Sequence, residues 1–171
     1  MKPPILLKTI LDICLYLLVI GFIVSVSFFI IQLITGENLS PLNINGTKII
    51  KFNTPSKVLI AIEMLIAGLF IYTIYILRKL VRDFFRGKLF TRFQIASLKI
   101  IGQLIILITI FQGIVNFVAP LLINSEGRIG IKVGFSFGSF WFILSIGLFF
   151  VFLSKVFQNA KNLKEENELT V

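Results

Sequence analysis

Four long apolar stretches dominate this sequence and constrain its fold more than any other feature. Three of them contain no charged residue and one contains only Glu63; they cover residues 13–36, 58–77, 100–125 and 133–154. About 20 apolar residues in a helix cross the roughly 30 Å hydrocarbon core of a bilayer. The sequence therefore predicts an all-α integral membrane protein with four transmembrane helices, at about residues 10–35, 58–80, 98–123 and 133–156.

The length leaves room for one domain and little else. Four spans of about 20 residues use roughly half of the 171 residues. We therefore expect a single membrane domain over residues 1–171 that ends in a charged tail at 157–171. The first apolar stretch is longer than the roughly 7–15 apolar residues of a signal peptide, so we expect it to remain as an anchor.

The composition argues against enzymatic chemistry. The chain has no His and a single Cys, Cys14, so the commonest general base and the commonest metal ligand are missing. The apolar stretches also lack paired carboxylates. We expect no enzyme activity, no metal site and no cofactor, and we interpret Cys14 as a small apolar residue of the first span.

The positive charge of the chain indicates its orientation in the membrane. A net charge of +9 in a soluble protein would suggest nucleic acid, but here Lys and Arg lie beside the apolar stretches. Two precede the first stretch, seven lie from Arg78 to Lys99 and three from Lys155 to Lys164, against three and two in the other connections. Since Lys and Arg favour the cytoplasmic side, we expect both termini in the cytoplasm. We expect these basic residues to contact the lipid bilayer, and we expect no direct binding of nucleic acid.

The two connections predicted to lie outside carry strand-like patterns. Residues 42–52 contain the turn signal Asn45-Gly46 between β-prone stretches, and residues 128–133 alternate with period two. A hairpin with a third strand would pair backbone groups just above the membrane. Two alternatives stay open: a small β-sheet in these loops, or two loops without a sheet.

The connection between the second and third stretches has the signals of a built corner. Gly87 suits the position after a helix end, and Thr91 with Gln94 matches the capping box that opens a helix. Phe90 and Ile95 occupy the positions of a hydrophobic staple across that cap. These residues predict a rigid helix–turn–helix corner at the cytoplasmic face, which is a statement about shape and implies no DNA binding.

Two parts of the sequence resemble the DUF2975 family of small bacterial membrane proteins. They are GKLFTRFQ at 87–94 with LKIIG at 98–102, and the ending FQNAKNLKEENELTV at 157–171. The order of four spans fits the family too, whereas Gln94 stands where Asn is expected. The resemblance implies a protein of the bacterial inner (cytoplasmic) membrane without known catalytic residues, and a neighbouring gene for a small Cro-like DNA-binding regulator.

Glu63 is the only charged residue well inside an apolar stretch. Charges at that depth usually face the interior of a helix bundle, and Gln112 and Asn116, four residues apart, share one face of the third helix. We expect Glu63 to hydrogen-bond one or both amides. Three roles stay open: a polar clamp between helices, a proton or cation site, or a side chain that reaches toward the membrane surface.

Gly134 and Gly138 form a G-x-x-x-G pattern at the start of the fourth stretch. Small residues let helices approach closely, so the pattern indicates packing inside the four-helix unit or, alternatively, a homodimer. In the tail the charge changes from Lys161 and Lys164 to three glutamates, and an amphipathic helix there would offer a docking surface.

Two functions follow from these observations. The first is a non-enzymatic membrane regulator or anchor, whose corner and tail engage a cytoplasmic protein partner. The second is a small transporter or channel in which Glu63 is the intramembrane polar site. The first is favoured, because one buried charge does not make a pathway and the spans lack Gly/Pro breaks in matching positions.

Overall fold

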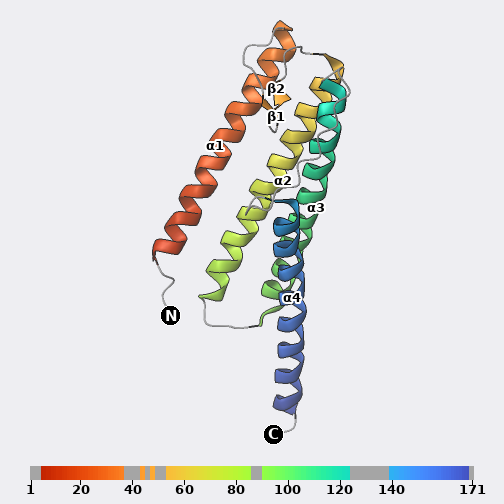
Figure 1. The fold of residues 1–171 in the computed structure, drawn as a ribbon. Coiled ribbons are helices and arrows are strands. Elements are labelled where there is room, and N and C mark those ends of the chain that lie inside the picture. The colour runs from red at the N-terminus through yellow and green to blue at the C-terminus, as the bar shows by residue number, and fades with distance from the viewer. Residues whose placement is uncertain are drawn as a thin grey trace.

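The computed structural model describes residues 5–36, 43–44, 47–48, 53–85, 90–123 and 139–169. These residues contain four long helices (Figure 1), which are α1 (Ile5–Thr35), α2 (Thr54–Phe84), α3 (Arg92–Ile123) and α4 (Phe140–Leu169). Each contains a stretch of mean hydropathy between 2.1 and 2.8 and is long and apolar enough to cross a membrane. The chain thus has the four apolar helices of the predicted all-α membrane fold.

The helices run alternately in opposite directions, and α2 and α3 form the centre of the arrangement. α1 packs against α2, and α4 packs against α3 (Figure 1). The start of α1, the end of α2, the start of α3 and the end of α4 lie toward one end of the molecule, which we call the corner end. The charged end of α4 and the predicted corner therefore lie on the same side.

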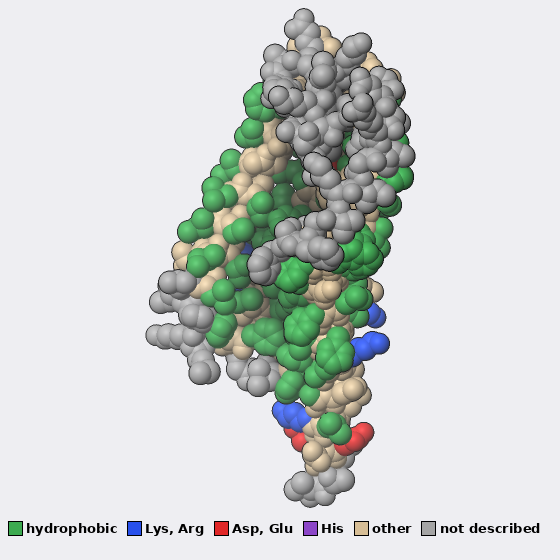
Figure 2. Space-filling model, viewed as in Figure 1, with side chains coloured by type: hydrophobic (Ala, Val, Ile, Leu, Met, Phe, Trp, Pro, Cys, Tyr) green, Lys and Arg blue, Asp and Glu red, His purple; other side chains and the backbone are tan. Residues whose placement is uncertain are grey.

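Hydrophobic side chains are exposed along all four helices, as expected for surfaces that face lipid. On the face in Figure 2 they follow the length of the helices, and charged side chains gather toward the end of α4. α1 is the least covered helix, because only 6% of its apolar stretch is buried, against 28% in α2 and in α3. The structure therefore has a tightly packed centre and a peripheral first helix.

The core has two parts along the length of the molecule. The part away from the corner end joins α2 to α3, with Phe29 of α1 against it; its buried members are Leu59, Ile60, Ile66, Val115 and Ala119. The part near the corner end also joins α2 to α3, and side chains of α4 cover it; its buried members are Ile76, Leu80, Leu98 and Ile101. Side chains of α4 thus cover the core near the corner end, and Phe29 of α1 packs against the other part.

α3 and α4 approach each other at two buried glycines, Gly102 and Gly147. A Cβ atom on Gly102 would lie 2.7 Å from the Gly147 carbonyl oxygen and 2.8 Å from the Val151 nitrogen. Those neighbours are backbone atoms, which cannot move aside cheaply, so glycine is needed for this approach. The sequence predicted close packing at Gly134 and Gly138, which lie outside the described residues.

α4 differs from its predicted span in length. The described helix begins at Phe140, after Ser139, whose hydroxyl oxygen accepts a 3.4 Å hydrogen bond from the Phe142 N–H. It then continues without a break to Leu169, past the predicted end of the span at 156 and through the charged tail, for which the sequence offered an amphipathic helix. The reason is that hydropathy marks where the apolar surface ends, while backbone hydrogen bonding extends a helix through polar residues as well.

Two very short strands lie on either side of the predicted Asn45-Gly46 turn, which is itself outside the described residues. β1 (Asn43–Ile44) and β2 (Thr47–Lys48) pair antiparallel, with Ile44 opposite Thr47. Two residues in each strand are far fewer than the three or more strands with a hydrophobic face that an independently stable sheet needs. This pairing does not support the predicted small β-sheet, and its expected third strand, residues 128–133, lies outside the described residues.

Candidate functional site

The corner end holds a hydrogen-bond network between the end of α2 and the start of α3. The Thr91 N–H donates to Oε1 of Gln94 at 3.1 Å, and the Gln94 N–H donates to the Thr91 hydroxyl oxygen at 3.2 Å. This reciprocal pair is a capping box, and the Gln94 side chain is fully buried. The Thr91 hydroxyl also donates to Oδ2 of Asp83 at 3.3 Å, which links the cap to α2.

Three aromatic rings close the corner on the side of α4. The ring of Phe157 in α4 meets Phe84 of α2 edge to face, with centroids 5.9 Å apart, and meets Phe90 at 5.2 Å. Phe90 has a φ of 60°, in the left-handed region that bulky residues rarely adopt. Its ring contact with Phe157 helps to stabilise this conformation. The sequence predicted Ile95 as the partner of Phe90; the ring contact of Phe90 in the structure is with Phe157 of α4.

One buried hydrogen bond fastens α4 to the same corner. The Ser154 hydroxyl donates to the carbonyl oxygen of Ile95, in the first turn of α3, at 2.8 Å. Ile95 is itself buried, as its place in the predicted corner requires. The corner therefore joins three helices, of which the sequence predicted two. Gly87 lies outside the described residues.

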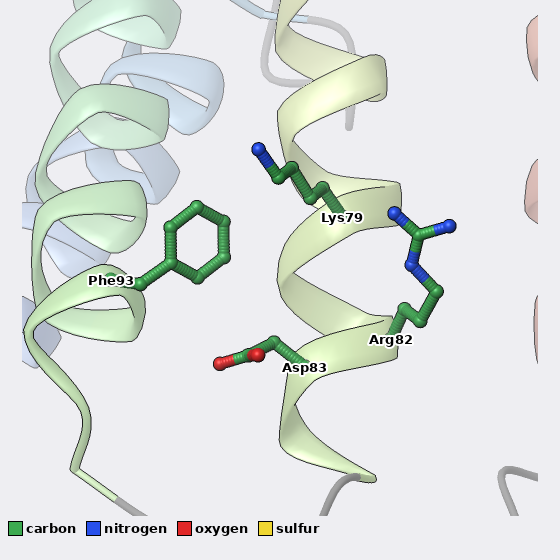
Figure 3. Close-up of a pocket in the computed structure, with 4 residues that line it drawn as sticks. All are labelled: Lys79, Arg82, Asp83 and Phe93. Atoms are coloured by element: carbon green, nitrogen blue, oxygen red, sulfur yellow. The ribbon is translucent and has the colours of Figure 1, made fainter.

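A pocket of about 210 Å³ lies beside this network. Lys79, Arg82 and Asp83 of α2 and Phe93 of α3 line it (Figure 3). Lys79 and Asp83 point toward α3, whereas Arg82 points to another side of α2. Nζ of Lys79 lies 5.0 Å from the centroid of the Phe93 ring, which is a cation–π contact. The pocket thus presents both signs of charge where the apolar part of α2 ends.

The structure brings Glu63 and Gln112 together within the apolar part of the molecule. Nε2 of Gln112 in α3 donates to Oε1 of Glu63 in α2 at 3.1 Å, and both residues are half-buried. Asn116 lies one turn farther along α3 and is exposed. The Gln112–Glu63 hydrogen bond has the geometry of a polar clamp between two helices.

An ion pair that the sequence did not predict joins α1 to α2. Nε of Arg78 contacts Oδ1 of Asp12, and both side chains are half-buried. The signal was present, because each residue stands at the corner-end limit of its apolar stretch. Antiparallel neighbouring spans bring such residues to the same level of the membrane. Pairing them required the knowledge that α1 packs against α2.

Among the described residues, no three His, Cys, Asp or Glu side chains are grouped to hold a metal ion. Cys14 is a free thiol, half-buried in α1.

α4 continues past the corner as an exposed helix (Figure 1). From Phe157 to Leu169 it adds about 18 Å at 1.5 Å per residue. Its charges pair along the helix, Lys161 with Glu165 at 3.2 Å and Lys164 with Glu168 at 3.8 Å, and residues 162–168 are exposed. We call residues 158–169 the α4 extension.

The fold and the sites together define a class: four apolar helices joined by polar ends make a multi-pass membrane protein. A family model described as a protein of unknown function, DUF2975, matches residues 47–171, well over half of the chain. The chain belongs to the DUF2975 family, which confirms the resemblance seen in its sequence. The match covers α2, α3 and α4 and begins after α1. Curated proteins and solved structures gave no match.

Proposed function

We propose that this chain is a non-enzymatic anchor or regulator that holds a basic cytoplasmic protein at a bacterial inner membrane. The α4 extension is the observation that carries this proposal. It leaves the packed helices as an exposed helix and ends in acidic residues (Figures 1 and 2). An exposed polar helix next to a membrane domain is accessible to a soluble partner. The contacts of Phe157 and Ser154 with the corner fix the start of this extension to the membrane domain.

Helix stability does not explain the charges of the extension. Glu165, Glu166 and Glu168 lie in the last two turns of α4, beside the partial negative charge of the helix C-terminus. Acidic residues are unfavourable there, and pairs such as Lys161–Glu165 contribute only about 0.2–0.5 kcal/mol each. A basic surface on a partner would offset this repulsion. The extension therefore favours a positively charged protein.

A small DNA-binding regulator suits this chemistry, because such proteins present basic surfaces to phosphate groups. The regulator whose neighbouring gene the family resemblance implies is therefore the first partner to test. While held on the acidic extension, its basic surface would be covered and its access to DNA reduced. This arrangement needs the corner end to face the cytoplasm, as the distribution of Lys and Arg predicts.

Photo-crosslinking in intact cells tests the proposal. A photoreactive residue at Leu163, 60% exposed on the extension, is compared with one at Tyr16, 62% exposed on α1. Position 163 should crosslink to a soluble protein and position 16 should not. Substitution of Glu165, Glu166 and Glu168 by Gln should reduce the adduct about tenfold, since it removes the charges that attract a basic surface.

Crosslinks from position 163 to lipid alone, or an adduct indifferent to the three Gln substitutions, would contradict an acidic docking helix. The alternative function, a small transporter or channel, requires Glu63 to exchange a proton or cation. The hydrogen bond from Gln112 supports a structural role for Glu63 instead.

A further inference from the structure

We infer that the pocket between α2 and α3 binds the headgroup of an aminophospholipid, with Lys79 on the phosphate and Asp83 on the ammonium group. This inference concerns a different surface from the α4 extension and does not depend on a protein partner. It rests on the position of the pocket, its charges, its size and the apolar side chains next to it.

The pocket lies where the headgroup layer of a bilayer is expected. The uncharged part of α2 ends at Leu77, and Lys79 and Asp83 follow within two turns. On α3, Phe93 belongs to the first turn, before the long uncharged part begins at Ile100. A charged pocket at the end of two apolar spans meets lipid headgroups rather than acyl chains or bulk water.

The charges in the pocket match a group that carries both a phosphate and an amine. The Lys79 ammonium is held over the Phe93 ring on the pocket side of α2, where it can pair with a phosphodiester (Figure 3). The Asp83 carboxylate points to the same side, and its hydrogen bond from Thr91 leaves acceptor capacity for an ammonium group. Lys79 and Arg82 in the lining attract any phosphodiester, but only a headgroup with an amine also pairs with Asp83, so an aminophospholipid is favoured.

The size of the pocket and its surroundings distinguish a lipid from a free anion. A volume of about 210 Å³ suits a headgroup and is below the roughly 300–1,000 Å³ typical of pockets that enclose whole ligands. Tyr75 and Tyr72 stand four and seven residues before Lys79, and Ile100 stands seven after Phe93, so they share faces with the pocket residues. All three are exposed and would lie along an acyl chain. Free phosphate would use none of them.

Lipid binding to the full-length protein in detergent, measured by native mass spectrometry, tests the inference. The probes are phosphatidylethanolamine, phosphatidylglycerol, phosphatidylcholine and inorganic phosphate. The wild type should bind phosphatidylethanolamine most tightly, about tenfold over phosphatidylglycerol, because only the amine pairs with Asp83. Phosphatidylcholine should bind less tightly than phosphatidylethanolamine, since its quaternary ammonium has no N–H to donate.

Three variants assign the contacts. Lys79→Gln should weaken phosphatidylethanolamine and phosphatidylglycerol alike, about tenfold. Asp83→Asn should abolish the preference between these two lipids, and it keeps an oxygen that can accept from Thr91, so the corner should survive. Lys155→Gln makes the charge change of Lys79→Gln at an exposed position of α4 and should alter neither affinity.

Three results would overturn the inference, and two of them need only the wild-type protein. Equal binding of phosphatidylethanolamine and phosphatidylcholine would remove the role of Asp83, whether or not its variant folds. Unchanged lipid binding by Lys79→Gln would show that the pocket is not the site. Competition by inorganic phosphate at the same concentrations would identify a free anion rather than a lipid as the ligand. None of these results depends on whether the α4 extension binds a protein.

Discussion

At the scale of single residues, side-chain hydrogen bonds join α2 to α3 at two levels of the molecule. The Thr91 hydroxyl accepts from the Gln94 N–H and donates to Asp83, so one group serves both the cap of α3 and its link to α2. Glu63 accepts from Gln112 across the same two helices. Such pairing is needed because a polar group buried in an apolar environment without a hydrogen bond is costly.

Substitutions at Glu63 separate a polar clamp from an ion site. Glu63→Gln should change the free energy of unfolding by about 1 kcal/mol or less, because Gln keeps an oxygen that accepts from Gln112. Glu63→Leu should be less stable, because it leaves the Gln112 amide without this acceptor. Thermal unfolding in detergent measures both. In the Glu63→Leu background, Gln112→Leu should restore part of the loss.

Transport measurements on the same variants can contradict the polar clamp. If wild-type proteoliposomes conduct protons or cations and Glu63→Gln abolishes the flux while it folds normally, the clamp is wrong and the transporter alternative is supported.

At the scale of elements, α4 has two roles along its length. Its first half packs on α3 through Gly147, and its middle closes the corner through Ser154 and Phe157. The rest projects as the exposed α4 extension. Because the helix is continuous, a force or partner on the extension acts on a rigid element that is anchored in the membrane domain.

The glycine contact between α3 and α4 predicts a position-dependent cost of adding one methyl group. Gly102→Ala should destabilise the protein by about 1–3 kcal/mol, because the new Cβ would meet Gly147 and Val151 backbone atoms at 2.7 and 2.8 Å. Gly21→Ala on α1 is the matched control, since no atom lies within 4 Å of its Cβ position. The control should be neutral or stabilising by up to about 1 kcal/mol. Equal unfolding temperatures for both variants would refute the close contact.

At the scale of the whole molecule, charged residues of the described helices gather at the corner end, where α2 ends and α3 begins. α1 joins the rest through the Arg78–Asp12 ion pair near the corner end and through Phe29 in the other half. It is also the helix that the family match leaves out. The family match thus covers α2, α3 and α4, and α1 is the least buried of the four described helices.

Cysteine labelling tests which end faces the cytoplasm. In a Cys14→Ser background, a membrane-impermeant maleimide applied to intact cells should label Asn45→Cys and not Lys88→Cys, because the Lys- and Arg-rich side stays inside. Permeabilised cells should label both positions and serve as the control for reactivity. Labelling at position 88 in intact cells would reverse the orientation and remove the α4 extension from the cytoplasm.

The sequence by itself determined the features that depend on near neighbours in the chain. The length of each apolar stretch predicted four spans, and Thr91 with Gln94, three residues apart, predicted the start of α3. It also identified Glu63 as a polar residue in need of a partner. The family resemblance was readable at residues 87–94, 98–102 and 157–171, which all lie inside the matched residues 47–171.

Only the tertiary structure decided which distant residues meet. Ser154 reaches Ile95, 59 positions away, and Gln112 reaches Glu63 across 49 positions. Gly102 with Gly147, Phe157 with Phe90, and Lys79 with Phe93 depend on the same helix pairing. The physical reason is that lipid-facing and core-facing residues of a membrane helix are equally apolar, so hydropathy does not show which face meets another helix. Side-chain shape and backbone approach decide that, and they exist only once the helices are packed together.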